Sequence, residues 1–194
     1  MVEVRLGLAT RPAIGYTENG DGHFVEQWDG KLLLAVFDGL GHGKVAAEAA
    51  ERCRAVLKQV YQRKIPEIFE VCHEELRRMR GVVMGIARIE LSTLLLNYAG
   101  VGNITMKIVG HEENTHLISM DGIVGYNLPG IRVFPYQLTR GDIIMMYTDG
   151  ISSSHLSGYS KEKIRSYDPQ ILAEEILNRC SKPEDDATVL ILHV

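Results

Sequence analysis

The chain opens with a strand pattern followed by a hairpin signal. Apolar residues at every second position over 2–9 predict a half-buried strand. The runs HFVEQW and KLLLAVF then flank Asp29-Gly30, a dipeptide typical of two-residue type I′ turns. Counting outward from this turn places Asp21 directly opposite Asp38 at the open end of the hairpin. Facing carboxylates repel each other. The pattern therefore predicts either a cation between them or a frayed, solvated hairpin end.

Two helical patterns follow the hairpin. Over Lys44–Val60 the apolar residues recur at helical spacing and form one face. Pro66 suits the first turn of a second helix, which we expect to end at Gly81. The residues expected to face inward in this second helix are Phe69, Cys72, Leu76 and Met79.

Beyond Gly81 the chain is again rich in strand-like runs, separated by Gly, Asn and Asp. These runs are VVMGIARIEL, TLLLNYA, NITMKIV, NTHLISM, IRVFPYQL, DIIMMYT and the final ATVLILHV. Asp168-Pro169 predicts one more helix, ending near Arg179, before the last of them. Because strands cluster around the helical pair instead of alternating with helices, the pattern predicts a mainly antiparallel α+β fold, not a doubly wound one.

Composition excludes several classes of function. The chain of 194 residues has a formal net charge of −4 and no dense Lys/Arg block, which argues against nucleic-acid binding. No apolar run approaches the roughly 18 residues of a membrane span, and the N-terminus lacks a signal-peptide core. Cys53, Cys72 and Cys180 are widely spaced, which favours buried free thiols. We therefore expect a cytoplasmic protein in a reducing compartment, with no membrane partner.

Several acidic residues stand at the ends of buried-looking strands. Asp149 follows IIMMYT, and Asp185 and Asp186 precede TVLIL. If the last strand runs antiparallel to the strands before Asp38 and Asp149, all these acids meet at one sheet edge. Carboxylates without His or Cys partners suit magnesium or manganese, and two such ions can support phosphoryl hydrolysis. The alternative is ordinary turn chemistry and a solvated loop.

The stretch DGLGHG could bring backbone amides close to an anion at the start of the helix over 44–60. Its spacing, however, fits neither the phosphate-binding G-x-x-x-x-G-K-[ST] loop nor the dinucleotide fingerprint G-x-G-x-x-G. A nucleotide-binding role is therefore disfavoured.

Five blocks along the chain resemble those of one enzyme family. FDGLGHG, YTDGI and DDATVLIL, with NGDGHFV before them and LLLNYAGVGNITMKIV between, are similar to the blocks of type 2C (PPM) metal-dependent protein serine/threonine phosphatases, in their SpoIIE-like branch. The resemblance implies a β-sandwich of two antiparallel sheets flanked by helices, in αββα layers. It further implies that residues 1–194 form one catalytic domain without an appended regulatory domain. The implied cofactors are two Mn²⁺ or Mg²⁺ ions.

The resemblance also implies roles for individual residues. Asp38 resembles the aspartate that bridges both ions, and Gly39 resembles the glycine whose carbonyl binds the second one. Asp149 resembles the next ligand, and Asp21 resembles an acid that binds metal directly or anchors its water. Of the last two acids, Asp185 aligns best with a ligand, although a slip of one residue would select Asp186.

Two positions depart from the family pattern. Many relatives carry a phosphate-binding arginine just before the first acidic block, and the only candidate here, Arg11, lies slightly too far upstream. Many also carry histidine directly after Asp-Gly as a general acid, where this chain has Leu40. His42 is the nearest alternative, as a proton donor or as a residue at the helix start facing solvent.

The resemblance implies hydrolysis of phosphoserine or phosphothreonine on bacterial signalling proteins, with STAS-domain stressosome proteins as the expected partners. The alternative is a non-catalytic pseudophosphatase that binds a phosphorylated partner on the same surface. In SpoIIE-like relatives, helices equivalent to 44–60 and 66–80 can couple partner binding to assembly of the metal site, and we expect the same coupling here.

Overall fold

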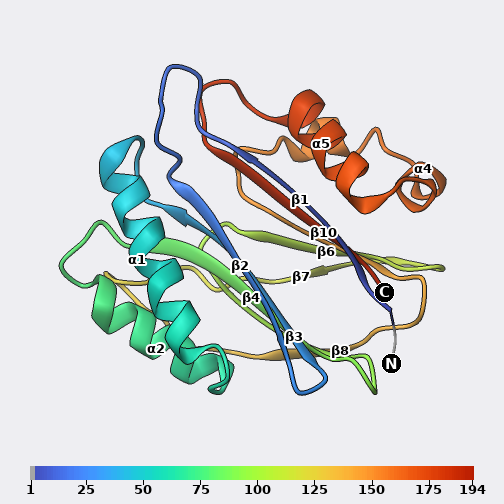
Figure 1. The fold of residues 1–194 in the computed structure, drawn as a ribbon, viewed down its shortest axis with the longest axis horizontal. Coiled ribbons are helices and arrows are strands. Elements are labelled where there is room, and N and C mark those ends of the chain that lie inside the picture. Colours follow the sequence, from blue (N-terminus) through green and yellow to red (C-terminus); the bar gives the residue numbers. More distant parts are fainter. Residues whose placement is uncertain (1–2) are drawn as a thin grey trace.

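A computed structural model describes residues 3–194 and shows two five-stranded sheets packed face to face (Figure 1). One sheet has the strand order β1-β10-β9-β6-β7, and every pairing in it is antiparallel. Its strands are β1 (Arg5–Arg11), β10 (Ala187–His193), β9 (Ile143–Tyr147), β6 (Thr105–Val109) and β7 (Asn114–Leu117).

The second sheet has the order β2-β3-β4-β5-β8 and is also antiparallel throughout. Its strands are β2 (Asp21–Trp28), β3 (Lys31–Gly39), β4 (Val82–Glu90), β5 (Leu95–Val101) and β8 (Phe134–Gln137). Among residues 3–194, no helix is both long and apolar enough to cross a membrane.

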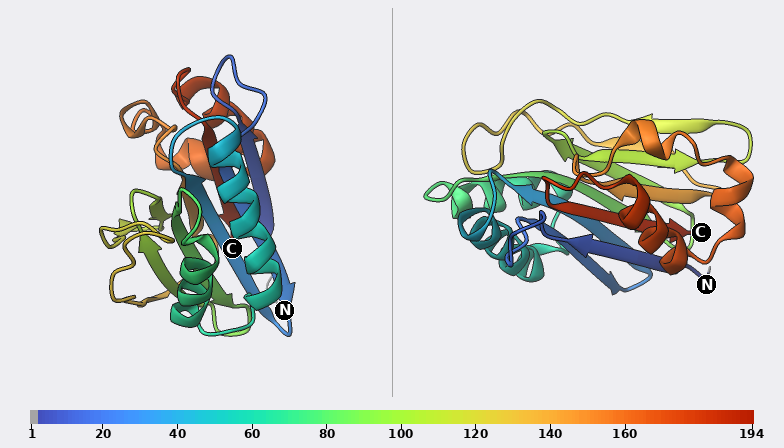
Figure 2. Two further views of the ribbon diagram at one scale, coloured as in Figure 1. Left: turned by 90° about the vertical axis from the view of Figure 1, so that its left-hand side faces the viewer. Right: turned by 90° about the horizontal axis from the view of Figure 1, so that it is seen from above.

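Helices cover the outer faces of both sheets (Figures 1 and 2). Two lie over the second sheet and three at the first sheet. They are α1 (Lys44–Val60), α2 (Ile65–Leu76), α3 (Ser153–Leu156), α4 (Lys161–Ser166) and α5 (Pro169–Cys180). The layers are thus helix, sheet, sheet, helix, as expected.

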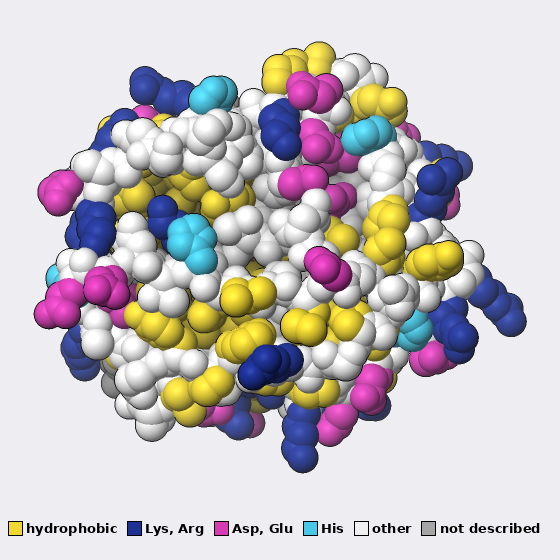
Figure 3. All heavy atoms as spheres, turned by 180° about the vertical axis from the view of Figure 1, so that it is seen from behind, with side chains coloured by type: hydrophobic (Ala, Val, Ile, Leu, Met, Phe, Trp, Pro, Cys, Tyr) yellow, Lys and Arg dark blue, Asp and Glu magenta, His cyan; other side chains and the backbone are white. Residues whose placement is uncertain are grey.

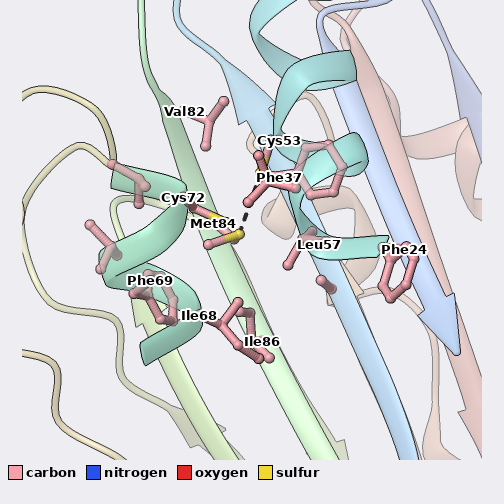
Figure 4. Packing of buried hydrophobic residues seen from close by; sticks show 14 of the residues in the cluster. Phe24, Phe37, Cys53, Leu57, Ile68, Phe69, Cys72, Val82, Met84 and Ile86 are labelled. Carbon is pink, nitrogen blue, oxygen red and sulfur yellow. Dashed lines mark hydrogen bonds between the residues drawn. The ribbon is translucent and has the colours of Figure 1, made fainter. Parts of the chain in front are cut away.

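Three apolar cores separate these four layers. The core between the sheets contains Leu34, Tyr98 and Leu190, among others. The core under α1 and α2 contains Phe37, Phe69 and Met84, as Figure 4 shows. The core under α5 includes Ile176 and Val189. Burial of these apolar surfaces supplies the main driving force for the fold.

All three cysteines are free and buried, as predicted. Cys53 and Cys72 lie in the core under α1 and α2, where the Cys53 thiol contacts Met84 Sδ at 3.7 Å (Figure 4). Cys180 lies in the core under α5.

The hairpin register is confirmed. Asp29 and Gly30 have φ of 41° and 74°, and positive φ at both central residues is the mark of a type I′ turn. Asp21 pairs directly with Asp38 across β2 and β3.

The first strand differs from the prediction over 2–9. It spans Arg5–Arg11, and Val2 lies outside the described residues. Leu6 is 39% exposed instead of facing the core. Val4 and Leu8 do pack partly against the core between the sheets, as the alternation predicts. The opposite side, at Gly7 and Ala9, is also buried, because α5 packs directly against it.

Other element boundaries were also wrong. The second helix ends at Leu76, before Met79 and Gly81, because the chain turns there and Gly81 adopts a φ of 81°. The strand expected over 114–120 stops at Leu117, and that over 131–138 shrinks to the edge strand β8. The short helices α3 and α4 were not predicted, since one or two turns carry too little periodicity.

Candidate metal centre

One cavity of about 320 Å³ lies where strands of both sheets end. Asp38 comes from the end of β3, Asp149 follows β9, and Asp185 precedes β10. The other residues lining it are Leu40, Gly41, His42, Val83 and Asn103. The last strand, β10, is antiparallel to β9, which meets one part of the condition stated above, but it does not pair with β3, which belongs to the other sheet. The acids therefore meet across the seam between the sheets.

Asp38 is the most perturbed acid in this cavity. Burial, followed by the nearby negative charges of Asp21, Asp149, Asp185 and Asp186, raises its pKa to about 9. A carboxylate in such surroundings ionises readily only when a cation offsets the negative charge.

Asp21 lies behind Asp38 and is only 4% exposed. Its Oδ2 accepts a hydrogen bond of 2.7 Å from the Thr148 hydroxyl, while its Oδ1 has no partner among the described residues. Burial raises its pKa to about 7 despite this hydrogen bond. An unpartnered buried carboxylate oxygen is costly, so it is well suited to accept from metal-bound water or to bind an ion.

Asp149 is oriented by a residue that the sequence did not single out. Asn103, in the turn between β5 and β6, donates a hydrogen bond of 2.8 Å from its amide to Asp149 Oδ2. Asn103 lies within the block LLLNYAGVGNITMKIV, whose resemblance to the family was the available signal. Its amide fixes one oxygen of the carboxylate and leaves Oδ1 available to other ligands.

The two adjacent acids before β10 point to different places. Asp185 lines the cavity, and burial followed by the charge of Asp149 raises its pKa. Asp186 is 3% exposed and accepts a hydrogen bond of 2.9 Å from the backbone N–H of Ala13. Its other oxygen would lie 2.7 Å from a Cβ on Gly20. Asp186 thus anchors the loop before β2, while Asp185 faces the cavity.

The glycines after Asp38 allow α1 to pack close to the cavity. A Cβ on Gly39 would lie 2.3 Å from the backbone oxygen of Ala46, so only glycine fits there. The Gly39 N–H donates to the Gly20 oxygen at 2.9 Å, which ties the ends of the hairpin together. Gly41 has a φ of 96°, which favours glycine and turns the chain toward α1.

The guanidinium of Arg11 is not free to point into the cavity. It donates to the Ser181 hydroxyl at 3.1 Å and to the backbone oxygens of Pro12, Lys182 and Asp185 at 2.7, 2.6 and 3.2 Å. These bonds occupy the guanidinium fork. Arg11 is therefore a clamp on the 181–185 loop and is not placed to bind a phosphate.

His42 stands at the rim of the cavity. Its Nδ1 lies 3.8 Å from Asp185 Oδ1, and its side chain is 48% exposed. Its ring centroid is 6.1 Å from that of Tyr16. Leu40, which occupies the position of the family's histidine, also lines the cavity but carries no proton to donate.

The residues present fit hard divalent cations. Over residues 3–194, no three His, Cys, Asp or Glu side chains close around a single point. The acids instead line the cavity singly, and all the candidate donors are carboxylate or backbone oxygens. Mg²⁺ and similar ions bind one or two carboxylates and retain several waters, so this spacing suits them. Figure 3 shows acidic side chains gathered in the upper middle of the face opposite to that of Figure 1.

The comparisons with known proteins agree with this architecture. The model of the family "Stage II sporulation protein E (SpoIIE)" matches residues 28–194. Phosphoserine phosphatase RsbX of Bacillus subtilis (strain 168) is 26% identical over 153 residues, which cover 75% of this chain and 76% of RsbX. A solved structure of RsbX in complex with magnesium superposes with a TM-score of 0.85 at 18% identity, covering 97% of this chain and 94% of that one.

Two further structures extend the match. One, described as "The bacterial stressosome: a modular system that has been adapted to control secondary messenger signaling", has a TM-score of 0.89 and 30% identity over 99% of this chain and 100% of that chain. The PP2C phosphatase domain of SpoIIE from Bacillus subtilis has a TM-score of 0.83 at 21% identity over 100% of this chain and 64% of that chain. The expected sandwich is confirmed as the fold of PP2C phosphatase structures, and the chain belongs to the SpoIIE family.

Proposed function

We propose that this chain is a metal-dependent protein phosphatase that hydrolyses phosphoserine or phosphothreonine. The observation that carries the proposal is the meeting of Asp38, Asp149 and Asp185 at one cavity, where burial and mutual repulsion raise the pKa of Asp38 to about 9. Such a cavity attracts divalent cations, and we infer two ions of Mn²⁺ or Mg²⁺. RsbX, which is similar to this chain, has been solved with magnesium.

We assign the roles of the carboxylates from their positions at and behind the cavity, and that of Gly39 from the resemblance to the family. Asp38, Asp149 and Asp185, with the Gly39 carbonyl, would hold the ions, and the buried Asp21 would orient water behind Asp38. Divalent ions bound there supply positive charge that activates water and offsets charge on the phosphoryl oxygens. We assign Asp186 an anchoring role, because its Oδ1 accepts from the Ala13 N–H; its buried Oδ2 has no partner among the described residues.

Hydrolysis also needs a proton for the leaving group. The oxygen of water forms the new bond to phosphorus, the bond from phosphorus to the seryl or threonyl oxygen breaks, and that oxygen leaves with a proton. We assign this donation to His42, whose Nδ1 lies 3.8 Å from Asp185 Oδ1 and whose Nε2 has no partner among the described residues. A proton released by the attacking water would restore His42.

We propose phosphorylated STAS-domain stressosome proteins as substrates. Support comes from the similarity to RsbX and to the structure described with the bacterial stressosome. The three buried free thiols suit a reducing compartment, so we place the reaction in the cytoplasm.

The test is release of phosphate from a phosphoserine STAS protein with and without Mn²⁺. We expect release only with the metal, and a loss of at least about 100-fold in kcat for Asp38→Asn and Asp149→Asn. Asp29→Asn is the matched control, since it removes the same charge at the far end of the same hairpin and keeps a residue suited to the turn.

Two results would contradict the proposal. Activity of Asp38→Asn equal to that of the unmodified chain would remove the metal role. Tight binding of the phosphoprotein without release of phosphate would instead indicate a non-catalytic binding module.

A further inference from the structure

A groove of about 360 Å³ lies beside the cavity. It is lined by Val45 and Glu48 of α1 and by the segment Arg78, Met79 and Arg80 that follows α2. The groove and the cavity share one wall, because Gly41 and His42 line the cavity and the same connection continues into Val45.

Arg80 is fixed at this shared wall. Its Nη1 lies 3.8 Å from the position that a Cβ on Gly41 would take. The next residue, Gly81, accepts a hydrogen bond of 3.1 Å from the Leu40 N–H. The backbone carrying Arg80 is thereby tied to the loop that carries Asp38.

The two arginines of the groove have no internal partner. Within residues 3–194, neither Arg78 nor Arg80 forms an ion pair or a side-chain hydrogen bond, and both are exposed. Other charges nearby are paired: Arg77 with Glu74, Arg52 with Glu75, and Lys44 with Glu48 at 3.9 Å. The carboxylate that lines the groove, that of Glu48, is thus already offset by its own lysine.

Exposed apolar surface accompanies this positive charge. Val45 is 49% exposed in the first turn of α1, and Met79 lines the groove beside it. An apolar floor with two unpaired guanidinium groups fits an extended segment that carries acidic side chains.

We infer that this groove binds the substrate segment next to the phosphorylated residue and selects acidic side chains there. The inference rests on the proposed phosphatase function. Arg80 is a specificity-determining residue in it: its charge faces the groove, beside the loop where the phosphoryl group would be held. Arg78 adds a second positive charge further from the cavity.

The experiment compares three phosphoserine peptides, which carry Asp and Glu, Asn and Gln, or Lys at the positions beside the phosphoserine. We expect the unmodified chain with Mn²⁺ to have a higher kcat/KM for the acidic peptide. Arg80→Ala should reduce this ratio about three- to fivefold, mainly through KM, and Arg78→Ala/Arg80→Ala about tenfold. Arg80→Glu should reverse the preference toward a peptide with Lys beside the phosphoserine, and Arg80→Lys should retain part of the original preference.

Arg77→Ala is the matched control, because it removes an exposed arginine from the same turn whose charge is already paired with Glu74. Thermal unfolding of each variant shows whether it remains folded. An unchanged ratio in Arg80→Glu would overturn the inference. An equal loss on all three peptides would also overturn it, because Arg80 would then act on the phosphoryl group itself. Release of phosphate from a phosphoserine STAS protein but from none of the peptides would also overturn the inference, whereas release from neither protein nor peptides would refute the underlying phosphatase function.

Discussion

At the scale of single residues, the acidic side chains gathered at and behind the cavity reduce the stability of the metal-free chain. Asp21 and Asp38 face each other, and both are shielded from water. Their raised pKa values mean that the folded chain retains protons that the unfolded chain releases. The same feature that would bind a cation therefore costs stability without one.

This cost predicts a pH dependence. The pKa of Asp38 is about 9 in the folded chain against an ordinary value of 3.8, and that of Asp21 is about 7. Between the ordinary pKa of 3.8 and these raised values, the folded state binds more protons than the unfolded state, so the free energy of unfolding falls as the pH rises. We expect the urea midpoint of the metal-free chain to decrease from about pH 5 to about pH 8, and Asp38→Asn to be more stable at the upper pH by at least about 1 kcal/mol.

Addition of Mn²⁺ at the upper pH should restore the midpoint of the unmodified chain but not that of Asp38→Asn. Asp29→Asn serves as the control for the loss of one charge. A metal-free midpoint that rises with pH in the unmodified chain would contradict this account.

Arg11 gives a second prediction at this scale. Its four hydrogen bonds hold the loop that positions Asp185, so we expect Arg11→Ala to reduce stability by about 2 kcal/mol and to weaken Mn²⁺ binding in calorimetry. Arg11→Lys should recover little, because an ammonium group cannot reproduce the planar fork. If Arg11 bound substrate phosphate instead, its loss would raise KM and leave unfolding and Mn²⁺ affinity unchanged.

At the scale of elements, glycines set how closely helices approach strands. A Cβ on Gly7 of β1 would lie 2.0 Å from the backbone oxygen of Pro169, at the start of α5. Backbone atoms cannot move aside as the end of a flexible side chain can. The helix and the strand therefore separate if the position gains a side chain.

We accordingly expect Gly7→Ala to lower the free energy of unfolding by about 2–4 kcal/mol, measured by urea denaturation. Gly130→Ala is the control, since no atom lies within 4 Å of the position that its Cβ would take and its φ is not in the left-handed region. Equal stability of the two variants would show that α5 can shift without cost.

Sequence analysis correctly predicted those features that depend on residues close together in the chain. Asp29-Gly30 is a two-residue turn, and it sets the whole β2–β3 register and the pairing of Asp21 with Asp38. The different surroundings of Asp185 and Asp186 could not be predicted in this way, because the Ala13 backbone that donates to Asp186 approaches from a distant part of the chain. Asn103 and Arg80 were missed for the same reason, since strand pairing alone brings Asn103 to its partner Asp149 and the backbone at Arg80 to the loop at Gly41.

At the scale of the whole molecule, the candidate centre lies at a seam. Asp38 belongs to one sheet, while Asp149 and Asp185 flank strands of the other. No described strand belongs to both sheets, so the two are held together mainly by the apolar core between them. Sequence patterning indicated acids at strand ends and left open whether the last strand joins those before Asp38 and Asp149, because periodicity does not reveal which sheet a strand joins.

This seam has a mechanical consequence. A cation bound by both Asp38 and Asp149 would act as a removable cross-link between the two sheets. A motion that slides one sheet over the other would separate the metal ligands, and a bound ion would oppose that motion. Catalytic activity would then depend on how the two sheets are aligned. A ligand that binds to either outer helical layer could change that alignment, and with it the activity, from a distance.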